Sequence, residues 1–483
     1  MLKTGTMHVR AVFAIGVLAL GASGVTAQPL AREGEGVRYD GHALVRVERP
    51  DARDLASLDA AGILMMSCEA SASGVDVLVP PGRMVVLDGL GLVYKVVLDD
   101  VQPALDAESA RVRDSLERFA RGEAGWYEDY KPAPEIDARI DELIARRPDL
   151  VSRSVIGTSH EGRPIWAIHV SSSSQACKPV FVVVGTTHAR EWITTMSVMY
   201  LTELLIDGHG SDADLTALVD SLDFLIVPVL NPDGYAFTWE ANRMWRKNRG
   251  PHPDWYQGTA RRGTDLNRNY SVDWGLNGSS NDPQSDTFRG AEPFSAFETA
   301  ALRDAVLAEP RVRGFVDVHS YANLVLYPWG TRPGSAPNAA EYQALGEEMA
   351  DAILDVHGEV FDVGPIRTHL YPISGGSTDW FHVEAGALGF LIEQRGPGFD
   401  PPATSILPGA QETAAGLLVE ARHVAEGPAY LTDLDRDCAH TYLDVFAFLL
   451  AFAAGDPVAD LDHNSVFTFD DALAFLTLFS EGR

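Results

Sequence analysis

The chain has 483 residues, enough for about three domains of ordinary size. Hydrophobic residues make up 46% of it and charged residues 22%, which is typical of a globular protein with a substantial core and excludes a largely disordered chain. The formal net charge of −30 argues against binding to nucleic acid or to an anionic membrane.

Residues 1–27 predict a secretory signal. Two basic residues, Lys3 and Arg10, lie near the start of the chain and precede a short apolar run. The small residues Val25-Thr26-Ala27 then provide a cleavage site. The apolar run is too short to span a membrane. We therefore expect export, to an extracellular or periplasmic location, rather than anchoring.

The cysteines argue against a disulfide framework. The chain contains only three of them, Cys68, Cys177 and Cys438. They are odd in number and far apart, so neither a set of disulfides nor a structural zinc cluster is implied. At most one bridge can form within the chain, and we predict none.

Residues 36–105 predict a small α+β unit. Apolar residues recur at every second position in 43–47, which indicates a half-buried strand, and residues 51–61 indicate a helix. Further strands are predicted at 76–79, 84–87 and 92–97. The charged stretch at 106–121 has little apolar pattern, and it predicts a solvated connector or a surface helix.

Strands and helices alternate over residues 122–428, which predicts an α/β domain. The predicted helices are 134–146 and 192–206, and the predicted strands are 154–158, 164–170, 180–184, 224–229, 314–318 and 388–392. Polar groups follow the last residues of four apolar strands, among them His188, His319 and Glu393. Because ligands bind past the carboxyl ends of strands in open α/β sheets, these strand ends predict a functional site.

The residues at these strand ends have the chemistry of a catalytic zinc site. Two histidines and one glutamate form a known catalytic ligand set, and His188, Glu191 and His319 are the candidates. A zinc-bound water then needs a carboxylate to take and return its proton, and Glu393 is the candidate. For His188 and Glu191 alone, the alternative is an ordinary solvated helix start.

These residues lie within a series of motifs that occur in one order along the chain. The motifs are THARE (187–191), NPDGY (231–235), NRMWRKNR (242–249), DLNRN (265–269), FRG (288–290), DVHSY (317–321), LYPWG (326–330), YPISGGSTDW (371–380) and IEQRG (392–396). With them, residues 122–428 resemble the zinc metallocarboxypeptidases of the pancreatic carboxypeptidase A and B type. The resemblance implies that family's fold, a mixed eight-stranded sheet with helices on both faces.

The resemblance also implies roles for single residues. It implies zinc ligation by His188, Glu191 and His319. Glu393 corresponds to the general base and acid, and Arg246 to the group that polarises the scissile carbonyl and holds the oxyanion.

The substrate contacts follow from the same resemblance. Asn267, Arg268 and Tyr371 correspond to a clamp on the free C-terminal carboxylate of the substrate, and Arg190 to an outer subsite contact. The position that is acidic in enzymes preferring Lys or Arg falls at Thr378. The same pocket is expected to be lined by Ile366, Leu370, Ile373 and Leu326. We therefore expect a preference for apolar or aromatic C-terminal residues. Asp317, two residues before His319, is the acidic residue that would work against this preference.

Residues 36–105 resemble the activation segment of the same family. The similarity lies in YDGHALVRV (39–47) and VLDDVQPALDAE (97–108). It implies a unit that inhibits the enzyme and assists its folding until it is removed near Arg118 or Arg121.

Residues 431–483 contain a repeat with a period of 27 residues (460 − 433). Oxygen-bearing side chains recur at positions 1, 3, 5 and 12 of two loops: Asp433, Asp435, Asp437 and Asp444, then Asp460, Asp462, Asn464 and Asp471. This is the calcium-loop pattern, although Cys438 and Ser465 stand where glycine is usual. The pair resembles a dockerin-type module, which implies a cohesin-like partner. The alternative is a helical hairpin with acidic turns and no metal.

The sequence therefore predicts a secreted zinc carboxypeptidase, made as a precursor, that removes C-terminal residues from peptides. One alternative keeps the zinc but acts on cell-wall or other amides. Another is a non-catalytic scaffold or adhesion protein that uses the terminal repeat. Because every candidate catalytic residue is retained, the carboxypeptidase is favoured over the non-catalytic scaffold or adhesion protein.

Overall fold

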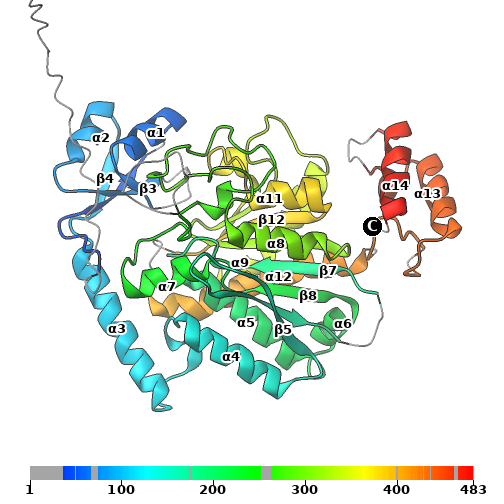
Figure 1. Ribbon diagram of the computed structural model, residues 1–483, viewed down its shortest axis with the longest axis horizontal. Coiled ribbons are helices and arrows are strands. Elements are labelled where there is room, and N and C mark those ends of the chain that lie inside the picture. The colour runs from blue at the N-terminus through cyan, green and yellow to red at the C-terminus, as the bar shows by residue number, and fades with distance from the viewer. Residues whose placement is uncertain are drawn as a thin grey trace, which may run out of the picture.

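The computed structural model describes residues 36–48, 50–66, 74–172, 177–251, 263–396, 398, 401–427, 429–435, 437–461 and 466–481. The signal predicted for residues 1–27 lies outside these residues, as do Cys68, Asp462 and Asn464. Figure 1 shows an N-terminal unit in blue, a large central domain, and a pair of C-terminal helices in orange and red at one side.

The N-terminal unit is an antiparallel four-stranded sheet in the order β2-β3-β1-β4, with two short helices. Its elements are β1 (Ala43–Val47), α1 (Ala52–Ala60), β2 (Leu64–Met65), β3 (Val75–Val79), α2 (Met84–Leu90) and β4 (Tyr94–Leu98). The strand predicted at 84–87 is wrong, because these residues begin α2. A four-residue apolar run fits either structure, and here only Leu87 is buried while Val85 is 68% exposed.

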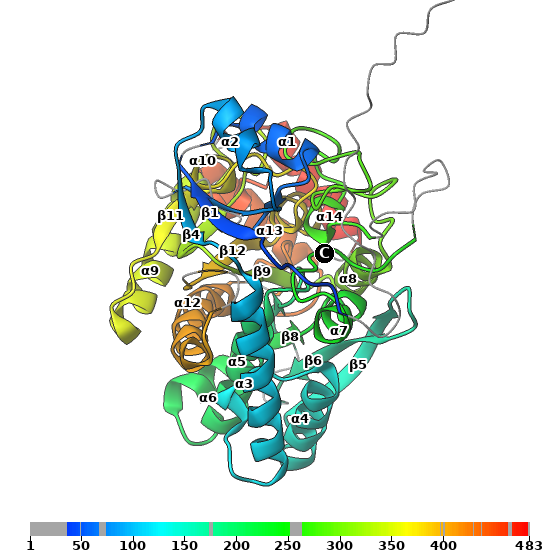
Figure 2. The same cartoon turned by 90° about the vertical axis from the view of Figure 1, so that its left-hand side faces the viewer.

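Helix α3 (Gln102–Ala120) joins this unit to the central domain and runs along the outside of the molecule (Figure 2). Of the two structures predicted for residues 106–121, the helix is the one that forms. It buries a single stripe at helical spacing, which includes Leu105, Glu108 and Val112. The sparse apolar pattern of this stretch therefore reflects one narrow buried face.

The central domain contains the predicted mixed eight-stranded sheet, in the order β11-β10-β12-β9-β7-β8-β6-β5. The strands are β5 (Val151–Thr158), β6 (Pro164–Val170), β7 (Val180–Val184), β8 (Asp223–Val227), β9 (Val312–Ser320), β10 (Leu324–Tyr327), β11 (Asp362–Pro365) and β12 (Leu388–Gln394). The four central strands, β12, β9, β7 and β8, are parallel to one another. Their carboxyl ends therefore meet at one edge of the sheet.

Helices cover both faces of this sheet. The helices of the central domain are α4 (Ala133–Arg146), α5 (Trp192–Gly208), α6 (Ala213–Ser221), α7 (Pro232–Glu240), α8 (Phe297–Leu307), α9 (Ala339–His357), α10 (Ile366–His369), α11 (Ser377–Trp380) and α12 (Ile406–Glu426). Phe181 and Val183 pack into the core beneath α4, α5, α6, α9 and α12, while Val182 and Val184 pack into the second core on the side of α8 and α11. This two-sided burial explains why β7 is apolar at every position.

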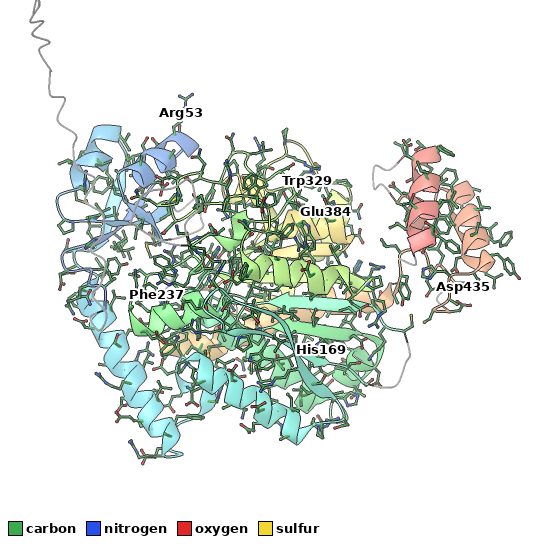
Figure 3. The ribbon with its side chains drawn as sticks, in the orientation of Figure 1. Arg53, His169, Phe237, Trp329, Glu384 and Asp435 are labelled. Atoms are coloured by element: carbon green, nitrogen blue, oxygen red, sulfur yellow. The ribbon has the colours of Figure 1, made fainter. Side chains whose placement is uncertain are left out.

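The C-terminal part consists of α13 (Tyr442–Ala454), the short helix η5 (Pro457–Ala459) and α14 (Phe469–Glu481). Phe448 and Phe475 stack at its centre with ring centroids 4.2 Å apart. Figure 3 shows Asp435 beside this pair of helices. Among the described residues, no helix is both long and apolar enough to cross a lipid bilayer.

Candidate active site

The turn after β7 brings His188 and Glu191 to the centre of the sheet edge. Thr186 has a left-handed backbone, with φ 53°, and its N–H donates to Oγ1 of Thr194 at 2.9 Å. Glu191 lies directly before α5, and its N–H donates to the carbonyl of His188 at 3.2 Å. The two side chains thus project from one tight turn.

His188, Glu191 and His319 converge in a buried cluster in which each residue is 1% exposed. Nδ1 of His188 lies 3.0 Å from Nδ1 of His319. Oε1 of Glu191 lies 2.8 Å from Nδ1 of His188, and its Oε2 lies 3.2 Å from Nδ1 of His319. Two imidazole nitrogens and a carboxylate therefore face one point, as the sequence predicted.

A second carboxylate stands behind each imidazole. Nε2 of His188 lies 3.2 Å from Oδ1 of Asp265, and Nε2 of His319 lies 3.2 Å from Oδ2 of Asp317. Burial opposes ionisation of Asp317, but His319 and the hydroxyl donors Ser377 and Thr187 lower its pKa below the usual value. An ionised carboxylate accepts from Nε2–H, which leaves each Nδ1 as the free lone pair.

Glu393 reaches the same place from β12. The register of the parallel strands pairs Glu393 with His319 directly, and Glu393 is 1% exposed. Side chains of paired residues leave the same face of a sheet, so the side chain of Glu393 lies on the same face as that of His319, one strand away.

Arg246 lies close to the cluster and is 4% exposed. Its Nη1 is 3.9 Å from Oε1 of Glu191, and its Nη2 donates to Oδ2 of Asp265 at 3.0 Å. Burial opposes ionisation of Asp265, but Arg246 and Arg268 lower the pKa of this carboxyl well below its usual value. Asp265 therefore orients both an imidazole and a guanidinium.

Arg268, Asn267 and Tyr371 also come together. Nη2 of Arg268 donates to the hydroxyl of Tyr371 at 3.3 Å, and its Nε donates to the carbonyl of Gly278 at 2.6 Å. Nδ2 of Asn267 lies 3.5 Å from Nε2 of His319. The loop 277–286 thus helps to hold Arg268 in place through Gly278.

The expected apolar pocket residues form a buried cluster. It consists of Leu324, Leu326, Ile366, Leu370, Ile373 and Leu391, with Tyr371 packed against it. Thr378 is 1% exposed at the start of α11. The carboxylate of Asp317 accepts from Oγ of Ser377 at 2.6 Å and from Oγ1 of Thr187 at 2.8 Å, in addition to facing His319. The carboxylate of Asp317 is thus already bound by side chains of the central domain.

Arg190 contacts the N-terminal unit. Its Nη2 donates to the carbonyl of Met65 at 2.7 Å, and its Nη1 lies 3.8 Å from Sδ of Met66. Glu108 of α3 pairs with Arg243, with Nε to Oε2 at 2.7 Å. The hydroxyl of Tyr321, two residues after His319, donates to Asp76 of β3. The N-terminal unit therefore lies against the residues that surround the cluster.

The first C-terminal loop also gathers carboxylates. An oxygen from each of Asp433, Asp435 and Asp437 lies within 4.8 Å of the other two. Asp444 caps this loop, accepting from the N–H of Asp435 at 3.3 Å and of Thr441 at 2.8 Å. In the second loop, Asp471 accepts from the N–H of Thr468 at 2.8 Å, and Asp460 is buried.

The residue set fits a zinc ion. Zinc bonds to nitrogen and oxygen are about 2.0–2.1 Å long, so tetrahedral ligand atoms lie about 3.3 Å apart, close to the separations in the cluster. The donor types are correct, and both imidazoles have the backing carboxylates that orient metal-bound histidines. Sequence reasoning missed this backing role for Asp265 and Asp317, although both lie inside the motifs that it used.

Comparison with known proteins agrees with this geometry. A family model described as zinc carboxypeptidase matches residues 136–416. Carboxypeptidase A1 of Rattus norvegicus is 34% identical over 341 residues, which cover 70% of this chain and 80% of that protein. Carboxypeptidase A1 of Bos taurus is 34% identical over 358 residues, covering 73% and 84%.

The chain belongs to the zinc carboxypeptidase family. It is a metallocarboxypeptidase hydrolase, a zinc exopeptidase of the carboxypeptidase A type.

Solved zinc carboxypeptidase structures share the fold. Carboxypeptidase A from Helicoverpa armigera superposes with a TM-score of 0.72 at 30% identity, covering 80% of this chain and 98% of that one. Thrombin activatable fibrinolysis inhibitor superposes with a TM-score of 0.71 at 26% identity, covering 80% and 100%. The fold predicted from sequence is confirmed for the central domain.

Proposed function

We propose that this carboxypeptidase is exported as an inactive precursor and that it removes apolar or aromatic residues from the C-termini of peptides. The observation that carries the proposal is the convergence of His188, Glu191 and His319 beside Glu393. The 1–27 segment and the composition support export.

In this proposal His188, Glu191 and His319 hold one zinc ion through Nδ1, a carboxylate and Nδ1. Zinc bound there lowers the pKa of water and polarises a carbonyl. Glu393 takes the proton from the attacking water and returns it to the leaving amine. Arg246, held by Asp265 at 3.0 Å, donates to the oxygen on which negative charge develops.

Substrate binding in this proposal uses the remaining polar residues. Arg268, Asn267 and Tyr371 bind the free C-terminal carboxylate, since a planar guanidinium suits bidentate recognition of a carboxylate. Arg190 contacts residues further from the scissile bond.

The proposed preference for apolar side chains rests on the pocket. Ile366 belongs to a buried aliphatic cluster, and Thr378 supplies no charge. A buried cation would need a facing carboxylate, but Asp317 already accepts from two hydroxyls and faces His319. We therefore expect substrates ending in Phe or Leu to be cleaved faster than those ending in Arg or Lys.

The experiment that tests the function is hydrolysis of N-blocked dipeptides ending in Phe or Arg by protein trimmed at its N-terminus. We expect release of Phe, its loss on treatment with a zinc chelator, and its recovery with zinc. The same Phe peptide with a C-terminal amide should be a poor substrate, whereas an amidase acting on other peptides would still cleave it. Glu393→Gln should lower kcat by about 10²–10⁴-fold and still retain zinc.

The contacts of the N-terminal unit support the precursor. Residues 36–105 engage Arg190 through Met65 and engage the neighbour of the cluster, Tyr321, through Asp76. The bond after Arg121 is the best site for removal, because α3 ends at Ala120 and residues 121–123 are exposed, whereas Arg118 is still helical.

The extent of the structural matches also supports this reading. Residues 122–483 make up 75% of the chain (362 of 483), yet the two matched structures cover 80% of it. The match therefore includes some residues before 122, which supports a counterpart of α3 or of the N-terminal unit in both structures. A structure of bovine thrombin-activatable fibrinolysis inhibitor, in complex with tick carboxypeptidase inhibitor, covers only 62% of this chain. We accordingly assign 36–105 to an activation unit, 106–121 to its connector and 122–428 to the enzyme.

We further propose that residues 431–483 form a calcium-loop module of the dockerin type. Carboxylates of Asp433, Asp435 and Asp437 gather in the first loop, which supports calcium there. Several large apolar side chains are exposed on α13 and α14, including Tyr442 at 79%, Phe446 at 59% and Phe469 at 74%. Such surfaces favour a protein partner, and the resemblance to a dockerin-type module implies one of the cohesin kind. Calcium titration followed by calorimetry on the full chain tests the metal.

A further inference from the structure

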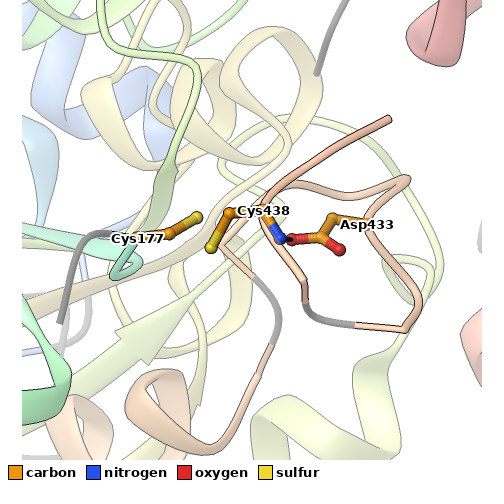
Figure 4. A group of neighbouring side chains, drawn as sticks. All are labelled: Cys177, Asp433 and Cys438. Carbon is orange, nitrogen blue, oxygen red and sulfur yellow. Dashed lines mark hydrogen bonds between the residues drawn. The ribbon is translucent and has the colours of Figure 1, made fainter. Parts of the chain in front are cut away.

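Two cysteines that are 261 positions apart (438 − 177) lie side by side in the structure. Cys177 lies just before β7 of the central domain, and Cys438 lies in the first loop of the C-terminal module. Their sulfur atoms and a carboxylate oxygen of Asp433 all lie within 4.8 Å of one another. Figure 4 shows the two thiols next to each other, approached from different parts of the chain.

The backbone at Cys438 is unusual for a cysteine. Its φ is 68°, in the left-handed region that favours glycine, and glycine is the usual residue at this sixth loop position. The N–H of Cys438 donates to Oδ2 of Asp433 at 3.0 Å, which fixes this conformation. A cysteine in this left-handed conformation strains the loop more than a glycine would. This strain indicates that the thiol itself has a role at this position.

The surroundings of the pair are suited to oxidation from one side. Cys438 is exposed, whereas Cys177 is partly buried. A soluble oxidant therefore reaches Cys438 first, and the thiol of Cys177 is already beside it for the second step.

We propose that Cys177 and Cys438 form a disulfide that ties the C-terminal module to the central domain. The thiolate of Cys438 attacks a small-molecule or protein disulfide, which forms a mixed disulfide and releases one thiol. The sulfur of Cys177 then loses its proton, attacks Cys438 and displaces the second thiol. Two cysteine thiols are oxidised and the oxidant disulfide is reduced to two thiols, so electrons and protons balance.

This link would give the module a fixed position on the enzyme and would hold the sixth residue of its first loop. It rests on the proposed export, since structural disulfides persist in oxidising compartments. The sequence alone argued against a disulfide because the two cysteines are so far apart in the chain. The fold supplies the missing proximity.

The test uses the purified full chain incubated with oxidised glutathione. Remaining thiols are alkylated under denaturing, non-reducing conditions, and the digest is examined by mass spectrometry. We expect one alkylated cysteine, Cys68, out of three, and a Cys177–Cys438 peptide pair that is lighter than the two free peptides by two hydrogens. Cys177→Ser and Cys438→Ser should each abolish the pair, while Cys68→Ser should leave it unchanged.

Three results would overturn the proposal. The first is alkylation of all three cysteines after oxidation, and the second is a link through Cys68 instead. The third is protection of Cys177 and Cys438 from alkylation in the folded protein that a chelator or denaturation reverses with no loss of hydrogens, which would mean a metal held with Asp433. Because oxidation is done on purified protein, with hydrolysis of the Phe substrate followed in parallel, failure of the link is separable from failure of export or of the peptidase.

Discussion

The carboxylate of Asp317 lies 3.2 Å from Nε2 of His319 on the same strand, two residues away. In a strand, residues i and i+2 share a face, so this pairing is built into β9 itself. Together with Asp265 behind His188, it gives both imidazoles of the cluster an orienting carboxylate.

Replacing Asp317 by Asn should weaken zinc binding. We expect roughly a 10–100-fold loss of affinity, because the variant can no longer fix the tautomer and orientation of His319 with a charged acceptor. The measurement is zinc release to a competing chelator. Asp351→Asn, which changes an exposed carboxylate on α9, is the control. Equal release rates for wild type and Asp317→Asn would mean that the contact does not tune the site.

Gly278 supports the segment that carries Tyr371. Its φ is 94°, and a Cβ atom there would stand 1.6 Å from the carbonyl oxygen of Pro372. Gly278→Ala should therefore displace Tyr371 and raise KM for peptides with a free carboxylate by about tenfold or more. Gly358→Ala is the matched control, because Gly358 has φ 79° but nothing lies within 4 Å of its Cβ position. Steady-state kinetics of both variants measure this effect. Identical KM values for the two variants would show that Gly278 does not position Tyr371.

The ion pair between Glu108 and Arg243 should help to keep the precursor inactive. Both side chains are largely buried, and removing one partner of such a pair costs about 2 kcal/mol or more. We expect Glu108→Gln to raise the activity of the uncut chain by about tenfold and to leave the trimmed enzyme unchanged. Asp106→Asn, an exposed change on the same helix, should have no such effect. Basal hydrolysis of the Phe substrate before and after trimming provides the readout.

Glu298 should make stability depend on pH. Burial raises its pKa from 4.5 to about 7, despite the bond that Oε2 accepts from Nδ2 of Asn248 at 2.7 Å. Because the folded-state pKa is raised, its contribution is fully present below about pH 4.5 and is lost as the pH rises to about 7. Glu298→Gln should therefore be more stable than wild type at pH 8, by up to about 3 kcal/mol, with little difference at pH 4.5.

Urea unfolding at pH 4.5 and pH 8 measures this difference. The control is Asp304→Asn on the same helix, whose side chain is 66% exposed. A Glu298→Gln variant that is less stable than wild type at both pH values would show that ionised Glu298 is accommodated by the core.

The strands that build the site were predictable because burial leaves a local signature. The apolar runs of β7, β8, β9 and β12 mark buried strands, and the polar residue that follows each marks the sheet edge. The short run at Met84–Leu87 gave the wrong element, because four apolar residues do not distinguish a strand from a helix turn.

Side-chain contacts between segments that are far apart in the chain could not be predicted from the sequence. The carboxylate behind His188 comes from Asp265, which is 77 positions away, and the neighbour of Cys177 comes from Cys438. No periodicity encodes these pairs, since they depend on strand order and on how loops pack at the sheet edge. The contacts of Arg190 with Met65 and Met66 required the placement of the whole N-terminal unit.

The central claim is that His188, Glu191 and His319 share one zinc ion beside Glu393. Anomalous X-ray diffraction from crystals of the protein, recorded on both sides of the zinc absorption edge, tests it most directly. The account predicts a single strong peak in the central domain, about 2.0–2.1 Å from Nδ1 of both histidines. Zinc-loaded crystals with no peak there, or with the only peak at other side chains, would contradict it.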